Sequence, residues 1–187
     1  MTINLFIQIF FTIFLILITL KGLYIILNGY QILGQAPINP GLFLLSKVCA
    51  SIIMIYPFLM TLGLKNRYII NHHYLVLSSL CIYLLGMTLF LISLYNLNSL
   101  SLKIGLPQEK TRLQTNGLYR FSRNPIYLSL FITFIGAVLY TQNPLILGCF
   151  IITTCLHVKI IIQEEHFLED QFGKEWLEYK KQVRRFF

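Results

Sequence analysis

The sequence IYLSLFITFIGAVLYTQNPLILGCFIITTCLHVKIII, residues 126–162, contains two apolar runs separated by four residues, Thr141 to Pro144. Asn143 and Pro144 are typical of a helix start, because asparagine caps the first turn and proline fits within it. A connection this short makes the two helices antiparallel neighbours. The stretch therefore predicts a tight helical hairpin whose arms approach the length that crosses a membrane, about 20 residues.

Three more apolar segments precede the hairpin, at residues 3–27, 42–64 and 74–97. Together with the hairpin they predict an all-α membrane protein with five transmembrane helices. We expect one structural domain in two parts. The first part, residues 1–97, holds three N-terminal transmembrane helices, and the second, residues 98–187, holds a polar loop, the hairpin and a C-terminal segment.

The composition supports a membrane protein over a soluble one. Hydrophobic residues make up 56% of the chain and charged residues only 12%, and the mean hydropathy is +0.70. Soluble domains average about 25% charged residues. The net charge of +8 therefore indicates a membrane orientation and no nucleic-acid partner. Neither the four cysteines, all in apolar runs, nor the pair His72-His73 suggests a metal site.

Basic residues gather at two places that five spans bring to one membrane face. Five lie in the loop 98–124 and five in the tail 163–187, whereas the loop 65–73 on the opposite face holds two. Basic loops face the cytoplasm, so we expect a multi-pass protein with this loop and the C-terminus cytoplasmic and the N-terminus outside. The tail mixes charge with aromatic residues such as Trp176, which predicts an amphipathic segment in the headgroup region.

The polar chemistry lies in residues 111–127 and 164–168, which the hairpin places side by side at the basic face. The start of a helix offers unpaired N–H groups to an anion, and Arg120 and Arg123 add positive charge beside it. The paired glutamates of the second segment offer carboxylates to an ammonium group or to hydroxyl groups. We interpret the two segments as a pocket for a small zwitterionic molecule.

Three motifs in this half resemble those of the integral-membrane methyltransferases, which include isoprenylcysteine carboxyl methyltransferase and the phospholipid N-methyltransferases. The first is GLYRFSRNPIY at residues 117–127, the second is EEHFL at residues 164–168, and the third is FGKEWLEYKKQVRRF at residues 172–186. Each motif alone is a weak pattern, but three in this order at this spacing are specific. The resemblance covers the second half of the chain.

The resemblance implies a methyltransferase that uses S-adenosylmethionine (SAM), with residues 98–187 as its catalytic half and a lipophilic or small acceptor that enters from the lipid bilayer. A carboxylate, amine or thiol of the acceptor would receive the methyl group by in-line transfer. The cofactor contacts that it implies are Thr111, Arg112, Leu113, Gln114, Tyr119, Asn124, Pro125, Ile126, Tyr127 and Glu164. The candidate catalytic residues are Arg120, Arg123, Tyr127 and Glu165. Tyr127 and Glu165, with His166, are candidate bases for an amine or thiol.

Two departures from the isoprenylcysteine enzymes leave the acceptor open. Asn124 stands where those enzymes usually have histidine, and it cannot titrate. Those enzymes also carry an arginine one turn before the paired glutamates, where this chain has Ile160 with Lys159 beside it. One residue rotates a helix position by about 100°, so Lys159 is only a possible substitute for that arginine.

Two other functions are weighed against methyl transfer: an NADPH-dependent membrane reductase of the sterol-reductase type, and a non-catalytic membrane subunit that binds lipid. The reductases have more spans than 187 residues can hold. In the simplest interpretation, Arg120 and Arg123 are interfacial basic residues and Tyr119 and Tyr127 are interfacial aromatic residues. Lys21 and Lys47 lie in apolar segments, where charged residues are usually functional.

Overall fold

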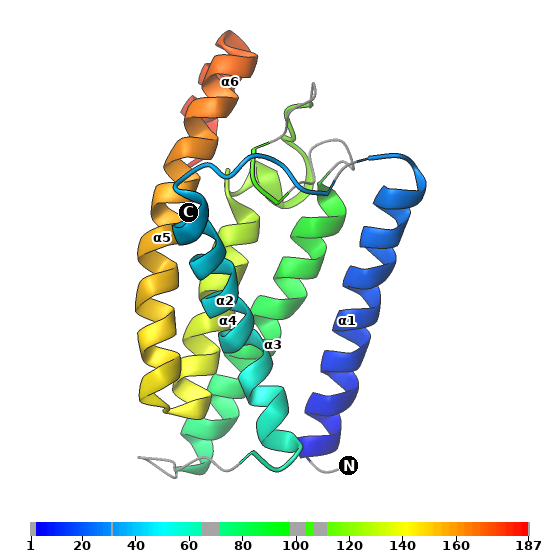
Figure 1. Cartoon of the computed structure of the whole chain (residues 1–187), viewed down its shortest axis with the longest axis vertical. Coiled ribbons are helices and arrows are strands. Elements are labelled where there is room, and N and C mark those ends of the chain that lie inside the picture. The colour runs from blue at the N-terminus through cyan, green and yellow to red at the C-terminus, as the bar shows by residue number, and fades with distance from the viewer. Residues whose placement is uncertain (1–2, 31, 65–71, 98–103, 107–111, 187) are drawn as a thin grey trace.

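The computed structural model describes residues 3–30, 32–64, 72–97, 104–106 and 112–186. All regular secondary-structure elements in this part of the chain are helices, which confirms the predicted all-α class (Figure 1). The elements are α1 (Ile3–Leu27), α2 (Pro40–Thr61), α3 (His73–Asn96), the 3-10 turn η1 (Gly117–Arg120), α4 (Pro125–Thr141), α5 (Pro144–Phe172) and α6 (Lys174–Gln182).

Four of these helices are long and apolar enough to cross a membrane, namely α1, α2, α3 and α5. The chain is therefore an integral membrane protein. The fifth predicted span corresponds to α4, an apolar helix of 17 residues. At about 1.5 Å per residue a helix of this length spans about 25 Å, slightly less than a hydrocarbon core of about 30 Å.

The most extensive helix contact joins α3 and α4, although a long loop separates them in sequence. Two glycines allow this close approach. A Cβ atom on Gly86 would overlap the backbone of Thr133, and a Cβ atom on Gly136 would overlap the backbone of Tyr83. Small residues commonly let transmembrane helices pack this closely. The helix α4, which starts at the Asn124-Pro125 motif, is therefore held in place by its close packing against α3.

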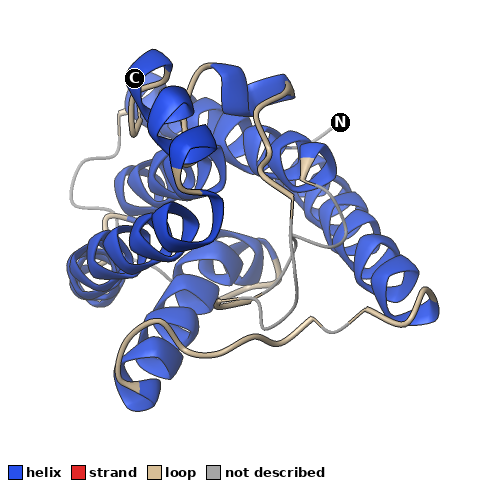
Figure 2. Ribbon diagram, turned by 90° about the horizontal axis from the view of Figure 1, so that it is seen from above, coloured by secondary structure: helices blue, strands red, loops and turns tan. Residues whose placement is uncertain are grey.

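The helices α1 and α2 meet near one end of the bundle and diverge toward the other (Figure 1). Near the meeting point Phe11 stacks on Phe58, with ring centroids 4.7 Å apart, and Ile7 and Phe14 are buried in the core. Seen from above, the upper ends of α1 and α2 stand well apart, and their connecting segment crosses between them (Figure 2). The hydrophobic core thus fills the lower part of the bundle.

The connection between α1 and α2 pairs with the loop that follows α3. Gly34 donates a hydrogen bond to the Ile104 carbonyl at 3.1 Å, and Leu106 donates to the Gln35 carbonyl at 2.8 Å. Gly105 has a φ of +101° and approaches the Gln35 backbone too closely for a side chain. This uncharged connection therefore lies at the same end of the bundle as the polar motifs.

The helix α5 extends ten residues beyond the predicted hairpin, so the predicted end of this helix at residue 162 is wrong. It ends at Phe172, where Gly173 adopts a φ of +50°. No proline or glycine interrupts residues 163–172, and good helix formers continue the helix after the apolar residues stop. Glu164 and Glu165 are therefore fixed on a rigid helix, and α6 follows with Trp176 and Tyr179 buried.

Candidate functional site

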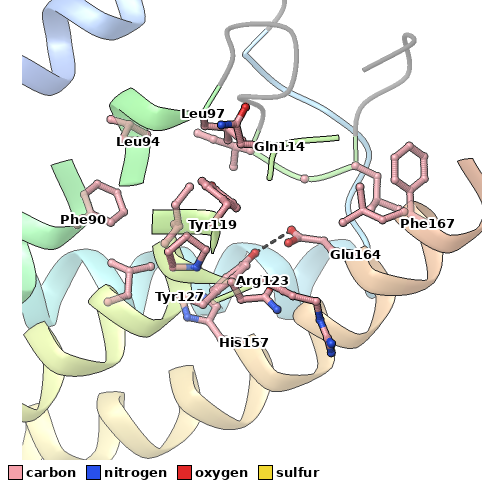
Figure 3. A pocket seen from close by; sticks show the side chains of 18 of the residues that line it. Phe90, Leu94, Leu97, Gln114, Tyr119, Arg123, Tyr127, His157, Glu164 and Phe167 are labelled. Carbon is pink, nitrogen blue, oxygen red and sulfur yellow. Dashed lines mark hydrogen bonds between the residues drawn. The ribbon is translucent and has the colours of Figure 1, made fainter. Parts of the chain in front are cut away.

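A cavity of about 440 Å³ lies in the upper part of the bundle, and all six helices contribute to its walls (Figure 3). Its volume lies in the range of small-molecule sites, about 300–1,000 Å³. The segments 104–106 and 112–114 and the turn η1 complete its walls. It therefore lies where the polar motifs of the sequence meet the apolar helices.

Most of the predicted site residues line this cavity. They are Arg112, Leu113, Gln114, Tyr119, Arg123, Asn124, Pro125, Ile126, Tyr127 and Glu164. Arg120 is exposed on η1 and is not among the wall residues, and Glu165 faces another side of α5. Thr111, a predicted cofactor contact, lies outside the described residues.

Glu164 presents its carboxylate to the cavity. The Tyr127 hydroxyl donates a hydrogen bond to Glu164 Oε1 at 2.7 Å, which joins α4 to α5 across the wall (Figure 3). No other hydrogen bond to this carboxylate is seen among the described residues, so acceptor capacity remains. A charged acceptor in a partly enclosed site binds ammonium and hydroxyl groups strongly.

Two tyrosines connect the wall of the cavity to α6. The Tyr179 hydroxyl donates a hydrogen bond to the backbone carbonyl of Tyr119 at 2.6 Å. Burial raises the pKa of Tyr179 to about 12. Burial is also the main reason that the pKa of Tyr119 is raised, and the nearby Tyr179 and Glu164 raise it further. Both phenols therefore stay protonated at neutral pH, and the Tyr179 hydroxyl acts as a hydrogen-bond donor.

Glu165 is the centre of a separate cluster, which we call the C-terminal latch: Arg123, Asn124, Glu165 and Arg185. Glu165 Oε2 accepts from Arg185 Nη2 at 2.7 Å, and Oε1 accepts from Asn124 Nδ2 at 2.9 Å. Arg123 Nη2 lies 3.3 Å from Glu165 Oε1, with both side chains buried. The hydrogen bond to Glu165 is the main reason that the pKa of Arg185 is raised.

The latch also fixes the backbone that follows α6. Arg123 donates from its backbone N–H to the Arg184 carbonyl at 3.0 Å and from its side chain to the Val183 carbonyl at 2.9 Å. Ser122 Oγ donates to the Arg185 carbonyl at 3.0 Å. The Arg123 guanidinium also lies over the Trp176 ring, 5.7 Å from its centroid. The latch therefore holds α6 as a wall of the cavity.

The two neighbouring carboxylates thus face different surroundings. Adjacent positions on a helix differ by about 100°, which directs Glu164 into the cavity and Glu165 toward the C-terminal segment. Asn124 belongs to both regions, because it lines the cavity and bonds to Glu165. It precedes α4 and makes no side-chain capping bond, and its Nδ2 group donates to Glu165 instead.

Several wall residues were not assigned to the site from the sequence, namely Lys21, Lys47, His157 and Trp176. His157 is fully buried against Tyr127, with ring centroids 5.3 Å apart. Within the described residues neither of its ring nitrogens has a hydrogen-bond partner, and the same holds for Trp176 Nε1. His157 precedes Glu164 by seven residues, two helical turns, and this spacing was the available signal.

Lys159 does not line the cavity. It is exposed on α5, while the neighbouring Ile160 is fully buried. The position one turn before Glu164 therefore supplies no cation to the cavity from this helix. In the part of the chain that the structure describes, no group of three or more metal-binding side chains is found either.

Comparison with known proteins places this architecture in a family. A model of the phospholipid methyltransferase family matches residues 74–175, more than half of the chain. Methanethiol S-methyltransferase 1 of Bradyrhizobium diazoefficiens is 35% identical over 80 residues, 43% of this chain and 27% of that protein. Protein-S-isoprenylcysteine O-methyltransferase B of Arabidopsis thaliana is 30% identical over 77 residues, 41% of this chain and 39% of that protein.

A third relative, the protein-S-isoprenylcysteine O-methyltransferase of Dictyostelium discoideum, is 34% identical over 83 residues, 42% of this chain and 35% of that protein. The matches thus span between 27% and 39% of the length of these curated relatives. No solved structure matches the chain. The family match begins in α3, includes α4 and α5, and ends in α6, so it contains Tyr127 and Glu164. The chain belongs to the phospholipid methyltransferase family of membrane methyltransferases.

Proposed function

We propose that the chain is an integral-membrane SAM-dependent methyltransferase that acts on a lipophilic or small acceptor. The observation that carries this proposal is the cavity at which all three sequence motifs converge on Glu164, Tyr127 and Tyr119. The relatives named above are methyltransferases for methanethiol or isoprenylcysteine. A carboxylate, amine or thiol acceptor is therefore compatible with the family. No observation favours a reductase or a non-catalytic subunit.

The residues of the cavity fit the chemistry of SAM. The Glu164 carboxylate keeps acceptor capacity for an ammonium group or a ribose hydroxyl, and Tyr127 fixes its orientation. Trp176 offers a buried N–H that no described residue accepts. Gln114 and Tyr119 add polar groups, and the aromatic wall offers apolar contact. We propose these residues, together with Arg112, Leu113 and Asn124–Tyr127, as the cofactor site.

When bound, SAM supplies a methyl group on a positively charged sulfur. The protein contributes position, orientation and exclusion of water, which account for much of the rate of an in-line displacement. The apolar helices around the cavity keep it poorly solvated, and such surroundings favour transfer to an anionic acceptor. An amine or thiol acceptor would first lose a proton. The hydrogen-bonded pair Tyr127 and Glu164, at the cavity wall, is our candidate for the group that accepts it.

We propose that Arg123 and Glu165 are positioning residues and do not take part directly in catalysis. Glu165 bonds to the other members of the C-terminal latch, and Arg123 bonds to Glu165 and to backbone carbonyls of residues 180–184. Arg120 is exposed and stands outside the cavity wall, so we do not assign it to the cofactor site. Of the four candidate catalytic residues, this leaves Tyr127 in the proposed cofactor site, where it is bonded to Glu164.

We also propose that α4 is a fifth span, antiparallel to α5, and that the cavity end of the bundle faces the cytoplasm. Both helices are joined by two residues and contact each other. The exposed basic residues of α6 and η1 lie at the cavity end, which agrees with the positive-inside rule. Residues 1–97 and 98–187 would then share one domain.

Ligand binding tests this proposal. Purified protein in detergent is titrated with SAM, with its demethylated product S-adenosylhomocysteine and with NADPH, and the melting temperature is recorded. A ligand that binds the native state raises Tm, so SAM and its product should raise it. No response to either would overturn the proposal. As matched variants, Glu164→Gln should abolish the shift and Glu178→Gln, on the exposed face of α6, should retain it.

A further inference from the structure

We propose that His157 is a further residue of the reaction site, and that its imidazole forms a hydrogen bond with the methyl acceptor and positions it for transfer. This inference rests on the proposed function and deepens it, because it names the side chain that holds the second substrate. His157 lies on α5 and lines the same cavity as Glu164 (Figure 3). It belongs to none of the three sequence motifs.

The imidazole of His157 is buried without a hydrogen-bond partner. The residue has no solvent exposure, and within the described part of the chain no group bonds to either ring nitrogen. A neutral imidazole has one donor and one acceptor nitrogen, and leaving them unpaired in the interior costs stability. A buried polar group of this kind calls for an explanation, and a ligand in the cavity supplies the missing partner.

Aromatic rings of α4 hold the imidazole in place. Measured between centroids, the Tyr127 ring meets it edge-on at 5.3 Å, and the rings of Phe131 and Phe134 each lie at 6.3 Å. The Tyr127 hydroxyl donates to Glu164, and the two phenylalanine side chains have no polar atom. The imidazole is therefore oriented by its neighbours, while its nitrogens keep hydrogen-bonding capacity that no described residue uses.

His157 lies deeper in the bundle than the proposed cofactor contact Glu164. It precedes Glu164 by seven residues, so the two side chains share one face of α5 and are about 10 Å apart along the helix axis. Apolar residues from three other helices, Ala50, Phe90 and Leu130, also line the cavity. A lipophilic acceptor is most stable against such apolar residues. Its reacting group, which points from there toward the cofactor, then lies beside His157.

Two side chains of the cavity wall, His157 and Trp176, hold buried nitrogens for which the described residues provide no partner. Trp176 lies on α6, and we assign its N–H to the cofactor. His157 lies in the apolar stretch of α5, and we assign its ring to the acceptor. Because a neutral imidazole both donates and accepts, it can bond to a carboxylate, an amine or a thiol. The methyl group passes directly from the sulfur to the acceptor, and His157 forms no covalent bond.

The stability of the ligand-free protein gives the first test. Replacing an unpaired buried polar group by an apolar one of similar shape is nearly neutral or stabilising. We therefore expect His157→Phe and His157→Leu to melt at the Tm of the wild type or above it. The matched control is Tyr83→Phe, which should lower Tm because the buried Tyr83 hydroxyl donates to the Met54 carbonyl. If both His157 variants lost as much Tm as Tyr83→Phe, the ring would be structural and the inference would be wrong.

Nuclear magnetic resonance of the imidazole nitrogens gives the second test. Protein labelled with ¹⁵N-histidine contains four histidines, and the signals of His157 are those missing from His157→Phe. Octanoate, octylamine, octanethiol and octane are each added at constant pH with excess S-adenosylhomocysteine. We expect at least one of the three polar probes to shift the His157 signals in a saturable manner, and octane to leave them unchanged. The signals of His73, exposed at the start of α3, should not move. Equal shifts with octane, or no shift with any polar probe, would overturn the inference.

Calorimetry with S-adenosylhomocysteine separates this inference from the proposed function. His157→Phe should bind it within about twofold of the wild-type affinity, which shows that the variant is folded and that its cofactor site is intact. If His157→Phe lost this binding, the ring would belong to the cofactor site and the inference would be wrong. If the wild type bound no S-adenosylhomocysteine but a polar probe still shifted the His157 signals, the proposed function alone would fail.

Discussion

Two adjacent glutamates on α5 face different surroundings: Glu164 lies on the face toward the cavity and Glu165 on the face toward the C-terminal latch. The two carboxylates differ in burial and in the number of groups that donate to them. Glu164 borders the cavity and, among the residues that the structure describes, accepts one hydrogen bond, from Tyr127. Glu165 is buried, and Arg123, Asn124 and Arg185 all donate to it. A carboxylate that retains acceptor capacity can bind a ligand, whereas a fully engaged one holds the structure together. Two adjacent residues of one sequence motif can therefore serve separate functions.

The largest effect is expected for Glu165→Gln on the latch face. The substitution leaves the buried Arg123 guanidinium without its charge partner, and breaking one side of a buried pair costs about 3–5 kcal/mol. We expect a large decrease in Tm and the release of the segment after α6. Thermal unfolding and limited proteolysis measure both. A Tm equal to that of the wild type would show that the latch is not structural.

On the cavity face, Glu164→Gln should weaken cofactor binding while leaving stability nearly unchanged. A hydrogen bond to a charged group contributes about 1.5–3 kcal/mol, which corresponds to about 10- to 100-fold in affinity. Titration calorimetry with S-adenosylhomocysteine measures the affinity, and a Tm measured without ligand provides the control. A loss of Tm as large as that of Glu165→Gln would erase the distinction between the two faces.

Tyr127→Phe should have a smaller effect of the same kind. It removes the hydroxyl that donates to Glu164 Oε1 at 2.7 Å but retains the ring that packs against His157. This hydrogen bond orients Glu164 and does not itself contact the cofactor, so the affinity should decrease by less than in Glu164→Gln, up to about tenfold. Unchanged affinity would indicate that Glu164 needs no orientation by Tyr127, and the comparison would then rest on Glu164 alone.

The smallest effect is expected for Glu169→Gln, which is a control for the latch. Glu169 pairs with Lys180 at 3.1 Å, as Glu165 pairs with Arg185, but both side chains are about 40% exposed. Exposed pairs contribute about 0–1 kcal/mol. The change in Tm should therefore be a small fraction of that in Glu165→Gln. Equal changes would mean that burial does not explain the strength of the latch.

Much of the fold followed from the sequence because apolar runs and helix-start residues are local signals. The pair Asn124-Pro125 does begin α4, and Asn143-Pro144 does begin α5. The predicted end of α5 was wrong, because the end of the apolar run was taken as the end of the helix. The close contact of α3 with α4 depends on Gly86 and Gly136, which become informative only when the two helices are placed together.

The sequence predicted only part of the candidate site, because local signals are visible in the sequence and contacts between distant segments are not. Motif spacing predicted that residues 111–127 and Glu164 lie together, and the structure places residues 112–114, Tyr119, residues 123–127 and Glu164 around one cavity. The division of labour between Glu164 and Glu165 depends on helix rotation and on Arg185, which is distant in sequence. The position of Lys47 in the cavity wall could not be predicted, because it depends on how α2 packs against the other helices.

One measurement tests the central claim most directly: titration of S-adenosylhomocysteine into the wild type, Glu164→Gln and Glu165→Gln by calorimetry, at a temperature where all three proteins are folded. We predict that the wild type binds, that Glu164→Gln loses at least tenfold in affinity, and that Glu165→Gln retains most of its affinity while folded. A wild-type protein that binds no S-adenosylhomocysteine, or a loss confined to Glu165→Gln, would contradict the account.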